Sequence, residues 1–269
     1  MFVYNRLEMK LKLDQHGLAH IGLIILIVVV IAVVGAVGFR VFQQKTSEDP
    51  NSKTSQSGQA VEDEATIELH NFGLASMDSV LVTNDALSEY DSMGLKGFYP
   101  FGDKLGGKDD TRLNPNFEFS SLKQGTKVVS AIDGIVAFIK EQPDTGDSEV
   151  FIQPSEGSIW TVGYDHISKV VVKKGDSIKA GAVIGDPTPQ GNGALRFEIQ
   201  VNKDQSGTTT HVCPSTLLAA DVKDSALQEL TAMQQAWNTV TGRALYDVTA
   251  QNPVGCLKTT MSVSEAEGR

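Results

Sequence analysis

The sequence predicts a mainly β fold, a compact antiparallel sheet or sandwich core that is preceded by a transmembrane helix and followed by an amphipathic helix. Short runs of β-branched and apolar residues, separated by glycine, recur over residues 126–201. Residues 21–39 contain no charge, and apolar residues recur every three to four positions over residues 227–240. With 269 residues, the chain is long enough for one substantial domain with accessory segments.

The apolar run of residues 21–39 predicts a membrane-spanning helix, because at about 1.5 Å per residue it covers roughly the 30 Å of bilayer hydrocarbon. A cleavable signal peptide is one alternative, but its apolar region would be about 7–15 residues long and would end at a small-residue cleavage site. A pilin-type leader is another, suggested by Gly17-Leu18 before the run. Gly22 stands where such leaders usually carry glutamate, so we favour the membrane anchor.

Basic residues are nearly balanced on the two sides of this span, so the positive-inside rule does not decide its orientation. The cysteines give a second criterion. An even number of cysteines, Cys213 and Cys256, in a membrane-anchored chain favours a disulfide in an oxidising compartment. We therefore expect a single-pass protein of the cell membrane with its N-terminus in the cytoplasm and its C-terminal domain outside.

Composition divides the chain into segments. Residues 43–65 are polar, with one proline and almost no large apolar residue, and therefore predict a disordered linker. The expected segments are a cytoplasmic N-terminus (1–20), the transmembrane helix (21–42), the linker (43–65), a lead-in segment (66–97), a β domain (98–210), a helical extension closed by the disulfide (211–258) and a flexible tail (259–269).

Charge argues against nucleic-acid binding. Lysine and arginine number 23 and aspartate and glutamate 33, which gives a net charge of −10. No basic cluster with interleaved aromatic residues follows the membrane span, so the electrostatic footprint of a nucleic-acid-binding protein is missing from the sequence.

Within the β domain, the dipeptide Asp133-Gly134 lies between two apolar runs and predicts a tight hairpin. The expected strands are residues 126–131, 135–139, 150–152, 159–162, 169–172, 182–184 and 195–201. Near the C-terminus, Ser225 is a candidate N-cap and Gly242 a candidate stop for the amphipathic helix.

The glycines and apolar residues of the β domain occur in a specific order. The motifs are Gly125-Thr126-x-Val128-x-x-Ala131-x-Asp133-Gly134-x-Val136, Tyr164-x-His166, Val172-x-x-Gly175-Asp176-x-Ile178-x-x-Gly181-x-x-Ile184-Gly185 and Phe197-Glu198-Ile199. This order resembles the lysostaphin/LytM-type zinc endopeptidases, which cut peptide cross-links in bacterial peptidoglycan. The resemblance covers roughly residues 98–202 and implies a LytM-type fold, a barrel-sandwich-like hybrid.

Most of the zinc site that this resemblance implies is replaced. An active member would carry a His-x-x-x-Asp pair and a His-x-His pair, which supply three zinc ligands and one catalytic histidine. By position, Asn114 and Glu118 stand for the first pair. Ala194 and Arg196 stand for the second, and only His166 matches a catalytic position. Because a catalytic zinc needs three protein ligands, we expect a degenerate member with no metal and no cofactor.

Alternation over residues 195–201 places Arg196, Glu198 and Gln200 on one face of a strand and the apolar residues on the other. Our hypothesis is that the Arg196 guanidinium takes the vacated metal position and pairs with Glu118. The alternative is that both are solvated surface charges. The candidate groove residues are Asn114, Glu118, Tyr164, His166, Arg196 and Glu198.

Two groups of aromatic residues leave alternatives open. Tyr164 could stack on His166, which could bind a peptide carbonyl or carboxylate, or the Tyr-x-His motif could remain for packing. Residues 98–102 could line the rim of the groove or anchor their loop to the core.

The resemblance favours a membrane-anchored envelope protein, a pseudoenzyme that binds peptidoglycan or regulates a cell-wall hydrolase. One alternative is an active zinc peptidase with an unusual ligand set drawn from Glu118, His166 and either Asp165 or Glu198. Another is a lipoyl-like adaptor module, whose carrier form would need a lysine at an exposed turn, and Asp133-Gly134 has none.

Overall fold

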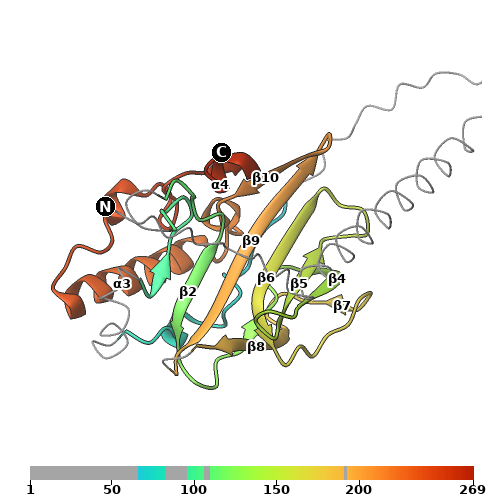
Figure 1. The fold of residues 1–269 in the computed structure, drawn as a ribbon, viewed down its shortest axis with the longest axis horizontal. Helices are drawn as coiled ribbons and strands as arrows, with labels where there is room; N and C mark the ends of the chain where they lie inside the picture. Colours follow the sequence, from blue (N-terminus) through green and yellow to red (C-terminus); the bar gives the residue numbers. More distant parts are fainter. Residues whose placement is uncertain (1–65, 83–95, 106–109, 191–192) are drawn as a thin grey trace, which may run out of the picture. The chain divides into compact units, whose positions relative to one another are not determined.

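A computed structural model describes residues 66–82, 96–105, 110–190 and 193–269, all of which belong to one compact unit (Figure 1). The expected cytoplasmic segment, transmembrane helix and linker therefore lie outside the described residues. Within the described ranges, no helix is both long and apolar enough to cross a bilayer.

The described residues form a mainly β structure with few helices, as the sequence predicts. The strands are β1 (Phe98–Tyr99), β2 (Phe117–Leu122), β3 (Val128–Val129), β4 (Gly134–Gln142), β5 (Asp147–Gln153), β6 (Trp160–Ser168), β7 (Ser177–Ile178), β8 (Val183–Pro189), β9 (Leu195–Gln205), β10 (Thr208–Val212) and β11 (Thr260–Ser262). The helices are η2 (Met77–Ser79), η3 (Pro214–Leu217), α3 (Lys223–Thr241), η4 (Val248–Ala250) and α4 (Val263–Ala266).

Long antiparallel strands form the middle of the sheet. β9 pairs with β2 on one side and with β6 on the other, β6 pairs with β5, and β5 pairs with β4. Every pairing between the named strands is antiparallel, in agreement with the expected sheet. Because β9 lies between β2 and β6, residues far apart in the sequence become neighbours on its surface (Figure 1).

The expected hairpin at Asp133-Gly134 is wrong. β3, which precedes this dipeptide, pairs with β8 and not with β4. The Asp133 carboxylate accepts a hydrogen bond from the Ala180 backbone at 2.9 Å and pairs with Lys179, which holds the connection against a distant loop. The chain only bends at residues 131–133, and the partner of the preceding strand lies more than fifty residues away.

The strand expected over residues 169–172 is also absent from the described structure. β6 ends at Ser168, and Lys169 has a left-handed backbone with φ 48°. That conformation breaks the extended geometry, so the following residues make only an irregular contact, in which the Val171 N–H donates to the Ile184 carbonyl at 3.0 Å.

Aromatic residues fill the core beneath β2 and β9. The Phe197 ring stacks parallel to that of Phe119 at 6.3 Å, and Phe98 contacts both Phe117 and Phe119. Phe98 and Phe101 are fully buried, so residues 98–101 anchor their loop to the core.

The C-terminal segment packs on the β2 side of the sheet (Figure 1). α3 begins at Lys223 with Val222 as its N-cap, so Ser225 lies inside the helix and bonds to the Val222 carbonyl instead of capping. Gly242 ends the helix with φ 63°, as expected of a left-handed C-cap. Buried Leu230 and Trp237 face the core.

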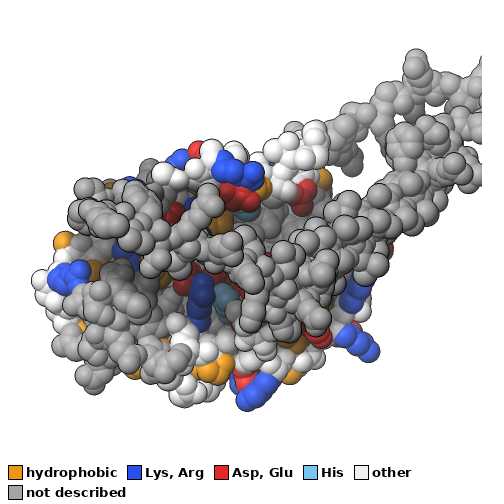
Figure 2. Space-filling view, viewed as in Figure 1, with side chains coloured by type: hydrophobic (Ala, Val, Ile, Leu, Met, Phe, Trp, Pro, Cys, Tyr) orange, Lys and Arg blue, Asp and Glu red, His pale blue; other side chains and the backbone are white. Residues whose placement is uncertain are grey.

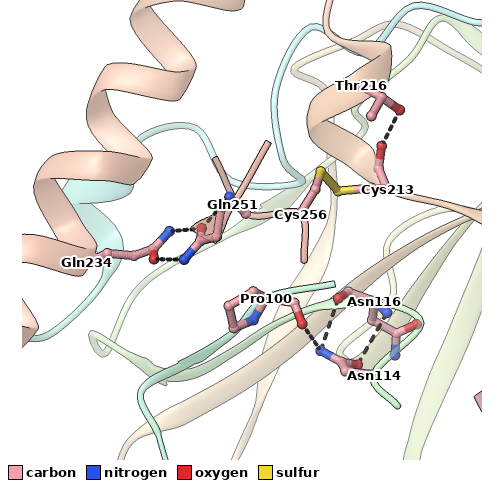
Figure 3. The surroundings of a disulfide bond; sticks show 9 residues. Pro100, Asn114, Asn116, Cys213, Thr216, Gln234, Gln251 and Cys256 are labelled. Carbon is pink, nitrogen blue, oxygen red and sulfur yellow. Dashed lines mark hydrogen bonds between the residues drawn. A yellow bond between two sulfur atoms is a disulfide. The ribbon is translucent and has the colours of Figure 1, made fainter. Parts of the chain in front are cut away.

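Cys213 and Cys256 form a disulfide, near which the side-chain amides of Gln234 and Gln251 pair in both directions (Figure 3). The expected flexible tail is partly ordered, because β11 pairs with β10 and α4 follows it. A capping box between Ser262 and Glu265 starts α4.

Candidate functional site

Four charged side chains meet on the face of the sheet opposite the aromatic core. Glu118 comes from β2, His166 from the end of β6, and Arg196 and Glu198 from β9. The register explains the meeting, because Glu198 lies opposite Glu118 on one side and opposite Asp165 on the other. We call Glu118, His166, Arg196 and Glu198 the charged cluster.

Arg196 lies between the two glutamates of the charged cluster. Its Nε lies 3.0 Å from Glu118 Oε1, and its Nη2 donates a hydrogen bond to Glu198 Oε1. The distance agrees with the hypothesis that Arg196 pairs with Glu118. The Nε–H is nevertheless buried and has no hydrogen-bond acceptor among the described residues, so its contact with Glu118 is electrostatic and not an aligned hydrogen bond.

His166 is held between two carboxylates. Its Nδ1 lies 2.8 Å from Asp147 Oδ2 and its Nε2 lies 3.4 Å from Glu198 Oε1. Burial alone would lower the pKa of His166, but the contacts with Glu198 and Asp147 outweigh it and raise that pKa to about 9. At neutral pH the imidazole is therefore protonated, and neither nitrogen has a free lone pair.

The backbone at His166 is also unusual. The residue adopts φ 59°, in the left-handed region that non-glycine residues rarely occupy. Its N–H donates to the Asp165 carboxylate at 2.6 Å, which supports this local bend. The pairing of β6 with β9 ends at Asp165, immediately before this bend, and the His166 ring lies between Asp147 and Glu198.

The two glutamates differ in their electrostatics. Burial and the neighbouring Glu198 charge raise the pKa of Glu118 against the effect of Arg196. Burial would also raise the pKa of Glu198, but the His166 hydrogen bond and the Arg196 charge hold it below its ordinary value. Glu198 is thus the fixed negative charge of the cluster, and Glu118 the carboxylate that is easier to protonate.

A row of amides extends from Glu198 along β9. Asn202 Nδ2 donates to Gln200 Oε1 at 3.0 Å, and Gln200 Nε2 donates to Asn116 Oδ1 at 2.6 Å. Asn116 Nδ2 donates in turn to Glu198 Oε2. At the far end, His211 Nδ1 lies 2.8 Å from Asn202 Oδ1. We call Asn202, Gln200 and Asn116 the amide row, and all its donors point toward Glu198.

Two predicted groove residues do not join the charged cluster. Tyr164 is fully buried, and its hydroxyl accepts a hydrogen bond from the Ala131 N–H at 2.7 Å. Alternation along β6 explains this, because Tyr164 points to the face opposite that of Asp165. Asn114 is buried as well and donates to the carbonyls of Tyr99, Pro100 and Asn116, which fixes its own loop. Figure 3 shows the contacts with Pro100 and Asn116.

Sequence reasoning missed Asp147 and Asn116. Asp147 belongs to no recognisable motif and reaches His166 only through the pairing of β5 with β6. Asn116 lies just before β2, and its position opposite the polar face of β9 could have been found had the pairing of these two strands been known.

The residues around the charged cluster match a known protein family. The model of Peptidase family M23 matches residues 119–207, which run from β2 to the end of β9. The chain carries an M23 domain. All of the charged cluster except Glu118, one residue before the match, lies within it. No curated protein matches the chain.

Several solved structures are similar to this chain. Lysostaphin from Staphylococcus simulans is 20% identical over 60% of this chain and 56% of its own, with a TM-score of 0.36. The catalytic domain of the prophage-encoded M23 protein EnpA from Enterococcus faecalis, solved as a point mutant, is 21% identical over 45% of this chain and 91% of that domain, with a TM-score of 0.34. A structure of the SpoIIQ–SpoIIIAH pore-forming complex gives 14% identity over 60% and 99%, with a TM-score of 0.39. The chain spans about half of lysostaphin.

The zinc implied by an M23 domain does not fit the residues of the charged cluster. Arg196, a fixed cation, contacts both Glu118 and Glu198, and His166 is protonated between Asp147 and Glu198. A divalent ion needs deprotonated ligands and would be repelled by both cations. In the described ranges, no group of three His, Cys, Asp or Glu residues is placed to hold a metal.

Proposed function

We propose that this chain is a membrane-anchored cell-envelope protein whose M23 domain binds peptidoglycan or a cell-wall hydrolase without cleaving peptide bonds. One observation carries the proposal. The Arg196 guanidinium lies among the carboxylates at the position where the resemblance implies a metal-ligating histidine. The M23 match supports the cell-wall theme, and the charge arrangement supports binding over hydrolysis.

Hydrolysis of an amide needs an activated water and a group that accepts its proton. Arginine does not ionise water, because its charge is monovalent and spread over a plane. His166 is protonated at neutral pH, with Nδ1 hydrogen-bonded to Asp147 and Nε2 3.4 Å from Glu198, so it lacks the lone pair of a general base. The residues of the charged cluster therefore supply neither the activated water nor the group that accepts its proton.

The location of the domain is part of the same proposal. The apolar residues 21–39 would anchor the chain in the cell membrane as a single span. The Cys213–Cys256 disulfide supports an oxidising compartment for the C-terminal domain. The M23 domain would then lie outside the cytoplasm, where peptidoglycan is found.

The test combines metal analysis, digestion and pull-down on the purified full chain. We expect no stoichiometric zinc, no cleavage of purified muropeptides, and co-sedimentation with insoluble peptidoglycan or capture of a cell-wall hydrolase. An active M23 peptidase serves as the positive control for digestion. Stoichiometric zinc together with muropeptide cleavage would overturn the proposal in favour of the zinc peptidase.

A further inference from the structure

Arg196 has hydrogen-bonding capacity that the protein does not use. A guanidinium carries several N–H donors in a fixed fork. In the described structure only Nη2 makes a hydrogen bond, to Glu198, and the buried Nε–H has no acceptor. The Nε–H is closed off from solvent and faces Glu118 Oε1 at 3.0 Å, so a ligand cannot reach it. The donors that remain for a ligand are those of the two Nη atoms, of which only Nη2 has a hydrogen-bond partner among the described residues.

Arg196 is also the member of the charged cluster that solvent reaches best. Its side chain is 35% exposed, compared with 11% for Glu118, 9% for Glu198 and 12% for His166. Figure 2 shows a basic side chain, a histidine and acidic side chains grouped in the middle of the visible face. An incoming molecule would therefore meet the guanidinium before it met the carboxylates.

The surrounding charges select the kind of acceptor. Glu118 and Glu198 lie against the guanidinium, and Asp147 and Asp165 flank His166. These carboxylates would repel an anionic ligand and leave a neutral acceptor favoured. A peptide carbonyl is a strong neutral acceptor, because its oxygen carries two lone pairs and a large dipole.

The amide row offers matching groups beside Arg196. Gln200 and Asn202 are partly exposed and follow Arg196 at alternate positions on the same face of β9. Side-chain amides can both donate to and accept from neighbouring peptide groups. A short extended peptide lying over this face would therefore find a fixed donor at Arg196 and adaptable amide partners next to it.

We propose that Arg196 is a ligand-binding residue that donates a hydrogen bond to a backbone carbonyl of a neutral peptide segment in peptidoglycan. This inference rests on the proposed function and names the chemistry that its binding uses. The guanidinium holds the carbonyl oxygen through the unused N–H groups of its Nη atoms, while the neighbouring carboxylates keep the guanidinium in place. No bond is made or broken in this step.

The test uses the full chain in detergent micelles and soluble peptidoglycan fragments released by a muramidase. We expect the Arg196 side-chain Nε–H signal in nitrogen-15 NMR, assigned by its loss in Arg196→Lys, to shift on titration. Arg196→Lys keeps the charge but loses the planar fork, and we expect its affinity to fall about tenfold, the effect of one hydrogen bond to a charged donor. Lys127→Gln, which alters an exposed ion pair with Asp186, is the control and should bind as the wild type does.

A capped tetra-alanine peptide tests the carbonyl itself. The peptide should shift the same Nε–H signal, and an analogue with one carbonyl reduced to methylene should lose the shift when the replaced group is the one that binds. An unmoved Arg196 signal on binding, or an Arg196→Lys variant with wild-type affinity and an unchanged melting temperature, would overturn the inference. In that case a chain that still binds peptidoglycan without zinc or cleavage would keep the proposed function. Binding of neither probe by the wild type also overturns the inference, whereas capture of a hydrolase would leave the proposed function standing.

Discussion

The two faces of β9 are made from alternate residues of one strand, yet they are held together in different ways. On one face, Phe197 and Ile199 are fully buried in an apolar core. On the other face, Arg196 and Glu198 sit in a network of charges that depends on β2, β5 and β6. Apolar packing is local and non-directional, whereas each charge in the network requires its partners to remain in place.

The two faces of β9 should therefore differ in the substitutions that they tolerate. A hydrophobic face accepts substitutions of similar volume, because only shape and apolar area matter. The polar face does not, since removal of one charge leaves its partner buried and uncompensated. Four substitutions, or changes of condition, test whether the two faces differ in this way.

The largest effect is expected for Phe197→Ala on the apolar face. The Phe197 ring stacks near Phe119 and Tyr164 and lies close to Gly73, where an added Cβ would come within 2.4 Å of it. Its loss should leave a cavity and lower the free energy of unfolding by about 3–5 kcal/mol. Chemical denaturation measures this, and a loss below about 1 kcal/mol would mean that the core does not depend on the ring.

On the polar face, Glu198→Gln keeps the shape of the side chain and removes its charge. The change leaves Arg196 and His166 without their shared carboxylate. We expect a loss of about 2–4 kcal/mol in the free energy of unfolding, because two poorly solvated cations then lie close together. Restoration of part of this loss by a second substitution, Arg196→Met, would show that the charges act as a unit. Additive losses would contradict that conclusion.

The third test is the dependence of stability on pH. The pKa of His166 is about 9 in the folded protein, above its ordinary value of 6.5. A raised histidine pKa stabilises the folded state fully below pH 6.5, and this contribution is lost as the pH rises through about 9. The free energy of unfolding should therefore fall by about 1–3 kcal/mol over this range. His166→Gln should flatten the profile, and an unaltered slope in that variant would assign the effect to another group.

The smallest effect is expected for Tyr164→Phe, which returns to the core face. The substitution removes the acceptor of the buried Ala131 N–H and should cost about 1–2 kcal/mol in unfolding free energy. Binding of peptidoglycan fragments should be unchanged, because the hydroxyl does not reach the charged cluster. Weaker binding by Tyr164→Phe at unchanged stability would show that Tyr164 belongs to the binding groove.

Prediction from sequence succeeded where it depended on alternation. The pattern of residues 195–201 placed Arg196, Glu198 and Gln200 on one face, and the structure keeps their apolar neighbours in the core. Side-chain direction in a strand follows directly from position, so no knowledge of the partner strands was needed. The Arg196–Glu118 contact followed because both positions derive from the same family motif.

Prediction failed where pairing is long-range. Asp133-Gly134 carries a local hairpin signal, but Val128 pairs with Gly185 and Val129 with Val183. A turn dipeptide predicts the conformation of the local backbone but not which strand pairs with the one before it. Asp147 was missed for the same reason, since only the register between β5 and β6 brings it to His166.

All hydrogen bonds of the amide row run in one direction, and Glu198 sets that direction. Every amide in the row donates toward Glu198, so reversing Gln200 alone would set oxygen against oxygen at one contact and NH₂ against NH₂ at the other. The hydrogen bonds of the row can therefore reverse only together. The negative charge of Glu198 determines which of the two directions is adopted. Without the charge of Glu198 both directions become possible. In the reversed one Asn202 donates to His211 Nδ1, so the His211 proton lies on Nε2 instead of Nδ1.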